Sequence, residues 1–493
     1  MSTILSVNGN CVTKFISNTV SLFTNGCEKS NDLDSMARET NALKRERESF
    51  NFRKFVCTAL KLLGGKGLHQ QSFHLENFRE KYMIDNDKEI SNKGFNKRLA
   101  NEDNIEFFTE CANQLMQQYN AKSMKNLDKT ASKELKEILD KLGVKDIYAV
   151  DGCEITLRES ARGKFPNKGV GRNKLDGRPA APAIKLHVLY SYVNRTFTKI
   201  DITEAVEDER QHVIEECLKG NILIADRGYI SEELEARLIG LGVKIIIKGK
   251  VNMVSGTIVE AYGENHTKLD DYIGKQYGEI KLQDDKYLDV TVQTKSGHNI
   301  RIVRMLNPNC ESTRKNPDAV HQQQEKAEGK YIYLRTNITR EKLSVEKLFM
   351  LYRLRWALEF FFACLQQGNC LKSINSSNKT IILTFILLSL MSALLKSYLA
   401  LCAILKKGKE TTLASLSMLK IHYKFFLFDE VFSKFGKVQK TQLYEYLNKL
   451  YDDIIKYNFP NSLYYIFFLG RPTFLFGGAA GGVINSSLSS NSN

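Results

Sequence analysis

Apolar residues recur every three to four positions along much of the first third of the chain. The segments from Met36 to Leu63 and from Asn104 to Tyr119 show this spacing, which predicts amphipathic helices, and Gly64-Gly65 ends the first of them. Bases and acids are interleaved along residues 35–142. The pattern therefore suits a helical DNA-binding region and a set of solvated helix faces equally well.

From residue 143 the pattern changes to short apolar or alternating runs. Strands are predicted at Asp146–Thr156, Ala183–Tyr192, Arg195–Ile202, Asn221–Asp226 and Lys244–Ile247, and helices at Glu207–Leu218 and Ser231–Leu241. Turn residues join the first three strands, which predicts an antiparallel meander. Residues 143–248 are therefore expected to form the first part of an α/β unit.

A polar, β-rich stretch at residues 249–335 interrupts this unit, with strands predicted at Tyr287–Gln293, Asn299–Met305 and Tyr331–Arg335. A helix beginning near Ser344 belongs to the second part of the unit, residues 336–373. Further helices are predicted in residues 374–475. Residues 1–34 form an N-terminal extension, and the Gly, Ser and Asn content of residues 476–493 predicts a disordered tail.

The uncharged segment Thr380–Leu395 raises the question of a membrane span. It is shorter than the roughly 20 residues that a bilayer requires, and Lys396 follows it, so a buried interior helix is expected. The first residues, Met1 to Thr19, lack a cationic stretch followed by a sustained apolar core. We therefore expect a cytoplasmic protein without a membrane partner.

Composition changes this picture by adding charge. The 493 residues, 43% of them hydrophobic, are enough for several folded domains. The net charge of +15 favours nucleic acid as the partner, although a merely basic protein is the alternative. Ten cysteines are scattered without a C-x-x-C pair, so neither a zinc site nor a disulfide framework is indicated.

Three acids stand out as candidates for chemistry. Asp151 and Asp226 end short apolar runs, and Glu359 lies on a predicted helix. Together they would make an all-oxygen pocket, which favours hard cations such as Mg²⁺ or Mn²⁺ and suits phosphodiester chemistry. Taken singly, each aspartate also fits an ordinary turn or cap role.

The helix from Ser344 carries a second pattern. Tyr352, Arg355 and Glu359 stand at i, i+3 and i+7, within about 60° of one another on one helix face. A guanidinium and a phenol on that face could contact DNA phosphates beside the carboxylate. An amphipathic helix with a plain Arg–Glu salt bridge is the alternative.

These motifs, in this order, resemble the bacterial insertion-sequence transposases of the DDE type, and in particular the insertion-sequence-four type with its Tyr-Arg-Glu-Lys signature. Tyr352, Arg355 and Glu359 match the signature, and Gln366 stands where its lysine is expected. The further matching blocks are Asp151-Gly152, Lys185-Leu-His187, Ala225-Asp-Arg-Gly-Tyr-Ile-Ser231 and Leu334-Arg-Thr-Asn337. The resemblance covers roughly Ile147 to Ser373.

The resemblance implies an RNase H-like catalytic core, a mixed sheet with helices, interrupted by the β-rich insertion and flanked by helical regions. It implies that Asp151, Asp226 and Glu359 hold two Mg²⁺ or Mn²⁺ ions per active site, one making a hydroxide and the other stabilising the leaving 3′ oxygen. The freed 3′ hydroxyl would then attack target DNA. The implied partners are double-stranded DNA, namely terminal inverted repeats and target, and a second copy of the chain in a synapsed homodimer. The implied location is the nucleoid of a bacterial cytoplasm.

DNA contacts are expected from Tyr352, Arg355, Gln366, Arg227, Lys185 and His187. For Arg227 the alternative is packing of its turn, and for Lys185 and His187 it is support of the site. Gln366 keeps a hydrogen bond but lacks the charge of the lysine. This departure leaves two alternatives to a cut-and-paste transposase: a decayed relic that binds DNA without cutting it, and an RNase H-like nuclease without strand transfer.

Overall fold

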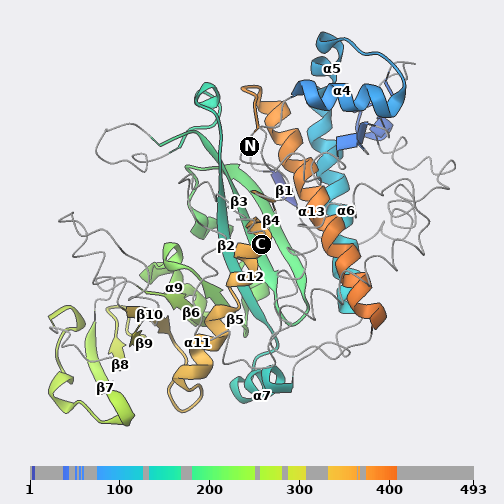
Figure 1. Cartoon of the computed structure of the whole chain (residues 1–493). Coiled ribbons are helices and arrows are strands. Elements are labelled where there is room, and N and C mark those ends of the chain that lie inside the picture. Colours follow the sequence, from blue (N-terminus) through green and yellow to red (C-terminus); the bar gives the residue numbers. More distant parts are fainter. Residues whose placement is uncertain are drawn as a thin grey trace, which may run out of the picture.

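The structure of the protein is a computed structural model that describes residues 3–5, 37–43, 50–52, 55–56, 58–59, 75–125, 133–167, 180–249, 256–279, 287–306, 331–363, 365–366 and 374–407. The predicted tail, residues 476–493, lies outside these residues, as do residues 408–475 and most of the extension 1–34. The described chain is a mixed α/β structure, as predicted, with one sheet that carries helices on both faces (Figure 1).

The sheet has ten strands in the order β1-β4-β3-β2-β5-β6-β10-β9-β8-β7. Their bounds are β1 Thr3–Leu5, β2 Ile147–Thr156, β3 Ala183–Ser191, β4 Thr196–Glu204, β5 Ile222–Ala225, β6 Lys244–Lys248, β7 Thr257–Tyr262, β8 Tyr287–Gln293, β9 Asn299–Leu306 and β10 Tyr331–Thr336. β5 is parallel to β2 and to β6, and all other pairs are antiparallel. The predicted meander of β2, β3 and β4 is confirmed.

The strands of the predicted insertion belong to the same sheet. β10 pairs with β6, and β9, β8 and β7 follow outward to the edge. The sheet therefore continues across the predicted boundary at residue 249. The division into core and insertion stays a prediction about segments of the sequence.

The helices are α4 Leu75–Asn86, α5 Asn92–Leu99, α6 Asp103–Met124, α7 Lys133–Leu142, α8 Glu215–Leu218, α9 Glu232–Gly240, α11 Val345–Arg353, α12 Trp356–Ala363 and α13 Lys379–Lys407, together with short 3₁₀ turns such as η5 Glu209–His212 and η6 Arg227–Tyr229. α6 and α13 lie side by side, although some 250 residues separate them in the sequence (Figure 1). α13 contains the predicted interior helix, and its residues Ile382, Leu388 and Leu394 are fully buried. In the described part of the chain, no helix has the length and apolar character needed to cross a membrane.

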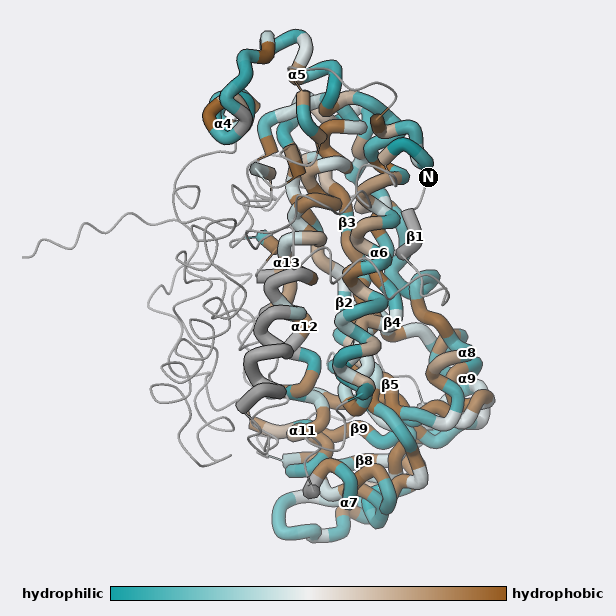
Figure 2. The backbone as a smooth tube through the Cα atoms, turned by 90° about the vertical axis from the view of Figure 1, so that its right-hand side faces the viewer, coloured by the Kyte–Doolittle hydropathy of each residue, from teal (hydrophilic) through white to brown (hydrophobic). Residues whose placement is uncertain are grey.

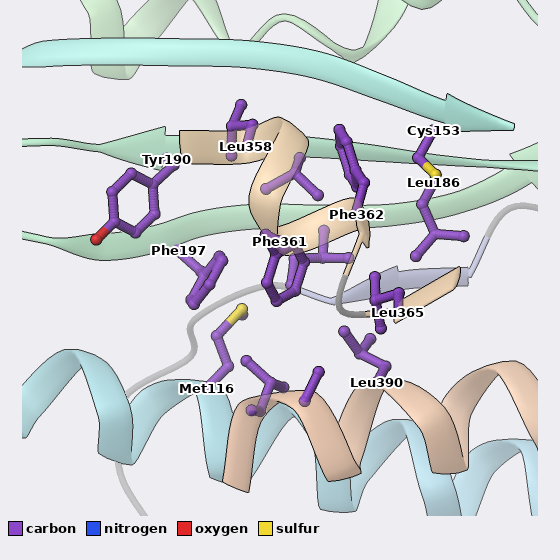
Figure 3. Close-up of a cluster of buried hydrophobic side chains, with 14 of the residues drawn as sticks. Met116, Cys153, Leu186, Tyr190, Phe197, Leu358, Phe361, Phe362, Leu365 and Leu390 are labelled. Atoms are coloured by element: carbon purple, nitrogen blue, oxygen red, sulfur yellow. The ribbon is translucent and has the colours of Figure 1, made fainter. Parts of the chain in front are cut away.

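Apolar side chains cover both faces of the sheet. On one face, α12 lies between the strands and the α6–α13 pair, and Figure 3 shows Phe361 of α12 among Met116, Leu390 and Phe197. On the other face, α9 packs against β5 and β6. Figure 2 shows hydrophobic stretches gathered inside and hydrophilic turns at the α5 and α7 ends. Since each buried large apolar side chain contributes about 1.5–3 kcal/mol, α12 is held firmly against the sheet.

Two of the predicted helices are interrupted. The first, Met36 to Leu63, is not continuous, because residues 40–43 form a turn in which Asn41 has a φ of 58°, and residues 50–51 are not helical either. The second is Glu207–Leu218. In place of a continuous helix over Glu207–Leu218, the chain forms the turn η5, an extended step at Val213 and Ile214, and the single turn α8. A tertiary contact explains the interruption, because His212 Nδ1 lies 2.7 Å from Asp201 Oδ2 of β4 and ties η5 to the sheet. Tertiary bonds of this kind override helix propensity.

A buried ion pair fixes the strand that leads toward α11. Arg335 of β10 donates from Nε and Nη2 to the two oxygens of Glu235 on α9, at 3.1 and 2.7 Å, and both side chains are almost fully buried. Two residues on, the Asn337 side chain accepts from the Ile245 N–H and donates to the Val243 carbonyl, each at 2.9 Å. The entry to α11 is thereby anchored to β6 and α9.

Breaking this pair should destabilise the protein strongly. Glu235→Gln leaves the Arg335 charge buried and uncompensated, which costs about 3–5 kcal/mol in the free energy of unfolding. The matched control is Glu233→Gln on the same helix, because Glu233 pairs with Arg237 at an exposed position and its loss should cost less than about 1 kcal/mol. Chemical denaturation measures both values. Equal effects of the two substitutions would contradict the anchoring role.

Candidate active site

Strand register brings the two candidate aspartates together. Val150 of β2 lies opposite Ala225 at the end of β5, and the two strands are parallel. Asp151, the next residue of β2, therefore lies at the same level as Asp226, the residue that follows the end of β5; β2 itself continues beside β3 to Thr156. Side chains alternate along β2, and the neighbours of Asp151 on its own face, Ala149 and Cys153, belong to the core that contains α12.

Arg355 joins the acids. Its Nη1 donates to Asp151 Oδ2 at 2.5 Å, and its Nη2 donates to Glu359 Oε1 at 2.5 Å. Its Nε donates to the Tyr352 hydroxyl at 3.2 Å, and that hydroxyl lies 3.5 Å from Asp226 Oδ1. One guanidinium therefore holds the carboxylates of β2 and α12, with the phenol linking them to the carboxylate that follows β5.

The surroundings of Arg355 are largely dry and strongly charged. Its side chain is only 7% exposed, against 14% for Asp151 and 32% for Glu359. Burial raises the pKa of Asp151 to about 7; the Arg355 charge opposes this rise, and the negative charges of Asp226 and Glu359 add to it. Burial alone would lower the pKa of Arg355, but Tyr352 and the three carboxylates raise it overall, so the guanidinium stays charged.

The predicted single helix from Ser344 is wrong in one respect. The Ser344 hydroxyl caps it by accepting from the Lys347 N–H at 3.4 Å, as expected for a helix start, but α11 ends at Arg353 and α12 begins at Trp356. Between them the Arg355 N–H donates to the Tyr352 carbonyl at 3.1 Å, a three-residue spacing tighter than an α-helix. At this turn the Arg355 guanidinium reaches Asp151, and Glu359 lies in the first turn of α12.

The predicted DNA contacts Gln366 and Arg227 differ in their surroundings: Gln366 is hydrogen-bonded to β2, whereas Arg227 is exposed. Gln366 Nε2 donates to the Glu154 carbonyl at 3.1 Å and lies 2.9 Å from Cys153 Sγ, so its amide is bound to the strand that carries Asp151. Arg227 follows Asp226 at the start of η6 and is exposed. Of the predicted DNA contacts, Arg227 has the exposure that a phosphate ligand requires.

Lys185 and His187 lie on the other face of the sheet. Their neighbours on β3, Leu186 and Val188, point into the core beside α12, so by alternation these two point away from it. Lys185 Nζ forms an ion pair with Glu209 at 2.9 Å. His187 is 2% exposed, bonds to Thr203 at 2.9 Å and stacks on His212. The structure thus brings together Asp151, Asp226, Tyr352, Arg355 and Glu359, but not these two.

Sequence reasoning passed over Glu209. Its segment, Glu207 to Arg210, is rich in charge and fits a solvated helix, so no pattern marked this residue. The structure places its carboxylate beside the backbone of Gly152 and Gly228. The only signal in the sequence was indirect, because glycines follow both candidate aspartates closely.

The donors at the site suit a hard divalent cation. Three carboxylates supply oxygens only, which is the ligand chemistry of Mg²⁺ and Mn²⁺, and no sulfur or imidazole ligand competes among them. Among the described residues, no group of three or more acidic, histidine or cysteine side chains is arranged so that it could hold a metal ion. At this site the Arg355 guanidinium lies between two of the acids, and its single positive charge offsets only part of their three negative charges.

Comparisons with known proteins place the chain in a family. A family model described as the transposase DDE domain matches residues 142–395, more than half of the chain. No curated protein sequence matches it. Among solved structures, the cryo-EM structure of the piggyBac transposase synaptic complex with hairpin DNA is similar, with a TM-score of 0.36, 10% identity, and coverage of 88% of this chain and 84% of that one.

The matched residues run from the end of α7 through the first half of α13. They include strands β2 to β10, α11 and α12. All five residues of the site, Asp151, Asp226, Tyr352, Arg355 and Glu359, therefore lie within the match. The order β4-β3-β2-β5-β6, three antiparallel strands followed by two parallel ones, is consistent with the expected RNase H-like core. On these grounds the chain belongs to the family of transposases with a DDE domain.

Proposed function

We propose that this transposase cleaves DNA at transposon ends and joins the freed ends to target DNA by a cut-and-paste reaction. The observation that carries the proposal is the meeting of Asp151, Asp226 and Glu359 around Arg355 within the matched DDE domain. Carboxylates from two parallel strands and a helix can surround a scissile phosphate from two sides. No nucleophilic side chain is needed for such a reaction.

In this proposal Asp151, Asp226 and Glu359 hold two divalent cations, Mg²⁺ or Mn²⁺. When bound, the ions lower the pKa of a water and stabilise the oxygen that leaves the phosphate. The protein contributes the fixed spacing of the carboxylates, because β2 and β5 are in register and α12 is packed against the sheet. The carboxylates also set the total charge that attracts the cations.

Arg355 is proposed to exchange its partners on DNA. In the structure its fork donates to one oxygen each of Asp151 and Glu359, and a cation that binds these two oxygens would compete with the guanidinium. A phosphate offers the fork a planar pair of acceptors of matching geometry. The Tyr352 hydroxyl, which accepts from Arg355 Nε, would keep the moved side chain near the site.

The proposal also covers the DNA substrate and the oligomeric state of the protein. The net charge of +15 and the exposed Arg227 support double-stranded DNA, both terminal repeats and target, as the partner. We infer a homodimer, membership of the insertion-sequence-four type and a bacterial cytoplasmic location from the resemblance to bacterial insertion-sequence transposases, which Tyr352, Arg355 and Glu359 carry in part. The N-terminal helices, residues 35–142, are proposed to bind the transposon end.

Substitution of the acids tests the reaction. Asp226→Asn should lower the rate of metal-dependent cleavage of an end-bearing duplex by about 1000-fold or more, because it removes a charge that holds the cation, and a mobility shift should show that DNA binding persists. Asp270→Asn, an exposed acid paired with Lys268, is the control and should cleave at the parent rate. Cleavage by Asp226→Asn at the parent rate would refute the assignment.

Cation binding should also depend on pH. With the pKa of Asp151 near 7, the metal-free carboxyl carries a proton below that pH, and a cation must displace it. Binding therefore strengthens as pH rises, and the Mn²⁺ affinity should be about tenfold higher at pH 8 than at pH 6, with little change above. Titration calorimetry at several pH values measures it. In Asp151→Asn the residual affinity should lose this dependence, and a flat profile in the parent would contradict the prediction.

A further inference from the structure

Glu209 occupies an unusual place behind the site. It begins η5, on the connection between β4 and α8. Its Oε1 lies 3.1 Å from the position that a Cβ atom on Gly152 would take, and its Oε2 lies 3.1 Å from the corresponding position on Gly228. The carboxylate therefore fits between two glycines, each in a segment that carries a candidate catalytic aspartate.

The two glycines explain why the carboxylate can come so close. Gly152 follows Asp151 directly, and Gly228 lies two residues after Asp226, in η6. A separation of 3.1 Å is tighter than most contacts of real Cβ atoms, so an alanine at either position would require the Glu209 carboxylate to shift by a few tenths of an ångström. The glycines of both motif blocks thus make room for one acid from a third segment.

Glu209 is held in this place from the sheet. Lys185 Nζ of β3 lies 2.9 Å from Oε1, and the two side chains are 15% and 28% exposed. Because Lys185 points away from the α12 face, the ion pair sits behind the aspartates and not among them. The contact also gives Lys185 a partner within the protein in place of a DNA phosphate.

The charges of Glu209 and of both aspartates act on a neighbouring phenol, Tyr229. Tyr229 of η6 is fully buried, and its hydroxyl has no hydrogen-bond partner among the residues that the structure describes. Burial raises the pKa of Tyr229, and the charges of Glu209, Asp151 and Asp226 raise it further, in that order. Glu209 therefore lies within electrostatic reach of the turn that carries Asp226.

We propose that Glu209 is a positioning residue of the transposase site, whose carboxylate contacts Gly152 and Gly228 and thereby adjusts the separation of Asp151 and Asp226 within the limits that the pairing of β2 with β5 sets. The inference rests on the proposed function, in which these aspartates share cations. The spacing acts through backbone contact from the far side of the sheet. It predicts that shape at position 209 matters more than charge, and that the effects of Glu209 and Gly228 are coupled.

The test is a double-substitution cycle with Mn²⁺ affinity, from titration calorimetry at pH 8, as the main measurement. Glu209→Ala should weaken Mn²⁺ binding about tenfold, while Glu209→Gln, which keeps the shape and can still accept from Lys185, should stay within about threefold of the parent. Gly228→Ala should weaken binding about tenfold in the parent but less than threefold in the Glu209→Ala background, where a methyl group has room. Glu216→Gln, which changes an exposed acid of α8 farther along the same connection, is the control and should bind like the parent.

The outcomes separate the two proposals. If Gly228→Ala has the same effect in both backgrounds, or if Glu209→Gln is as weak as Glu209→Ala, the positioning role is overturned. The same cycle measured by unfolding of the metal-free protein is independent of the reaction. Coupling in stability without coupling in Mn²⁺ affinity would show a contact that does not position the site, which also overturns the role. Failure of the parent to cleave end-bearing DNA in Mn²⁺ would instead count against the proposed function.

Discussion

The pairing of Arg355 with Asp151 and Glu359 is the interaction on which the arrangement of the site depends. Burial raises the pKa of Asp151, and repulsion by the nearby carboxylates of Asp226 and Glu359 raises it further, so bringing the three acids together is costly. A buried guanidinium lowers the cost by lying between two of them. The chain tightens beside this residue, between α11 and α12, where the Arg355 N–H donates to the Tyr352 carbonyl.

The sheet supplies the second constraint. Parallel pairing of β2 with β5 puts Asp151 and Asp226 at one level, and the family match covers both strands. The Arg335–Glu235 pair and Asn337 then fix β10 against β6, so that the chain enters α11 from a defined place. Packing of α12 between the sheet and the α6–α13 pair completes the position of Glu359.

Much of this could be predicted from the sequence. The strands of the meander and the grouping of Tyr352, Arg355 and Glu359 follow from short-range patterns, and these patterns also carried the resemblance. The adjacency of Asp151 and Asp226 instead depends on the pairing of β2 with β5, which are far apart in the sequence. Alternation along β3 shows that Lys185 and His187 share a face, but it cannot say which face α12 covers. The break at Arg355 and the turn η5 that carries Glu209 accompany contacts with distant segments, Asp151 in the first case and Asp201 in the second.

In the proposed reaction, cations replace Arg355 at Asp151 and Glu359, and the Arg355 guanidinium moves onto a DNA phosphate. The most direct measurement is a pair of crystal structures, without DNA and with an end-bearing duplex in Mn²⁺, with anomalous scattering used to locate manganese. We predict manganese peaks bound by Asp151, Asp226 and Glu359 in the complex, with the Arg355 guanidinium moved onto a DNA phosphate. Manganese bound elsewhere, or Arg355 still bridging Asp151 and Glu359 in the complex, would contradict the claim.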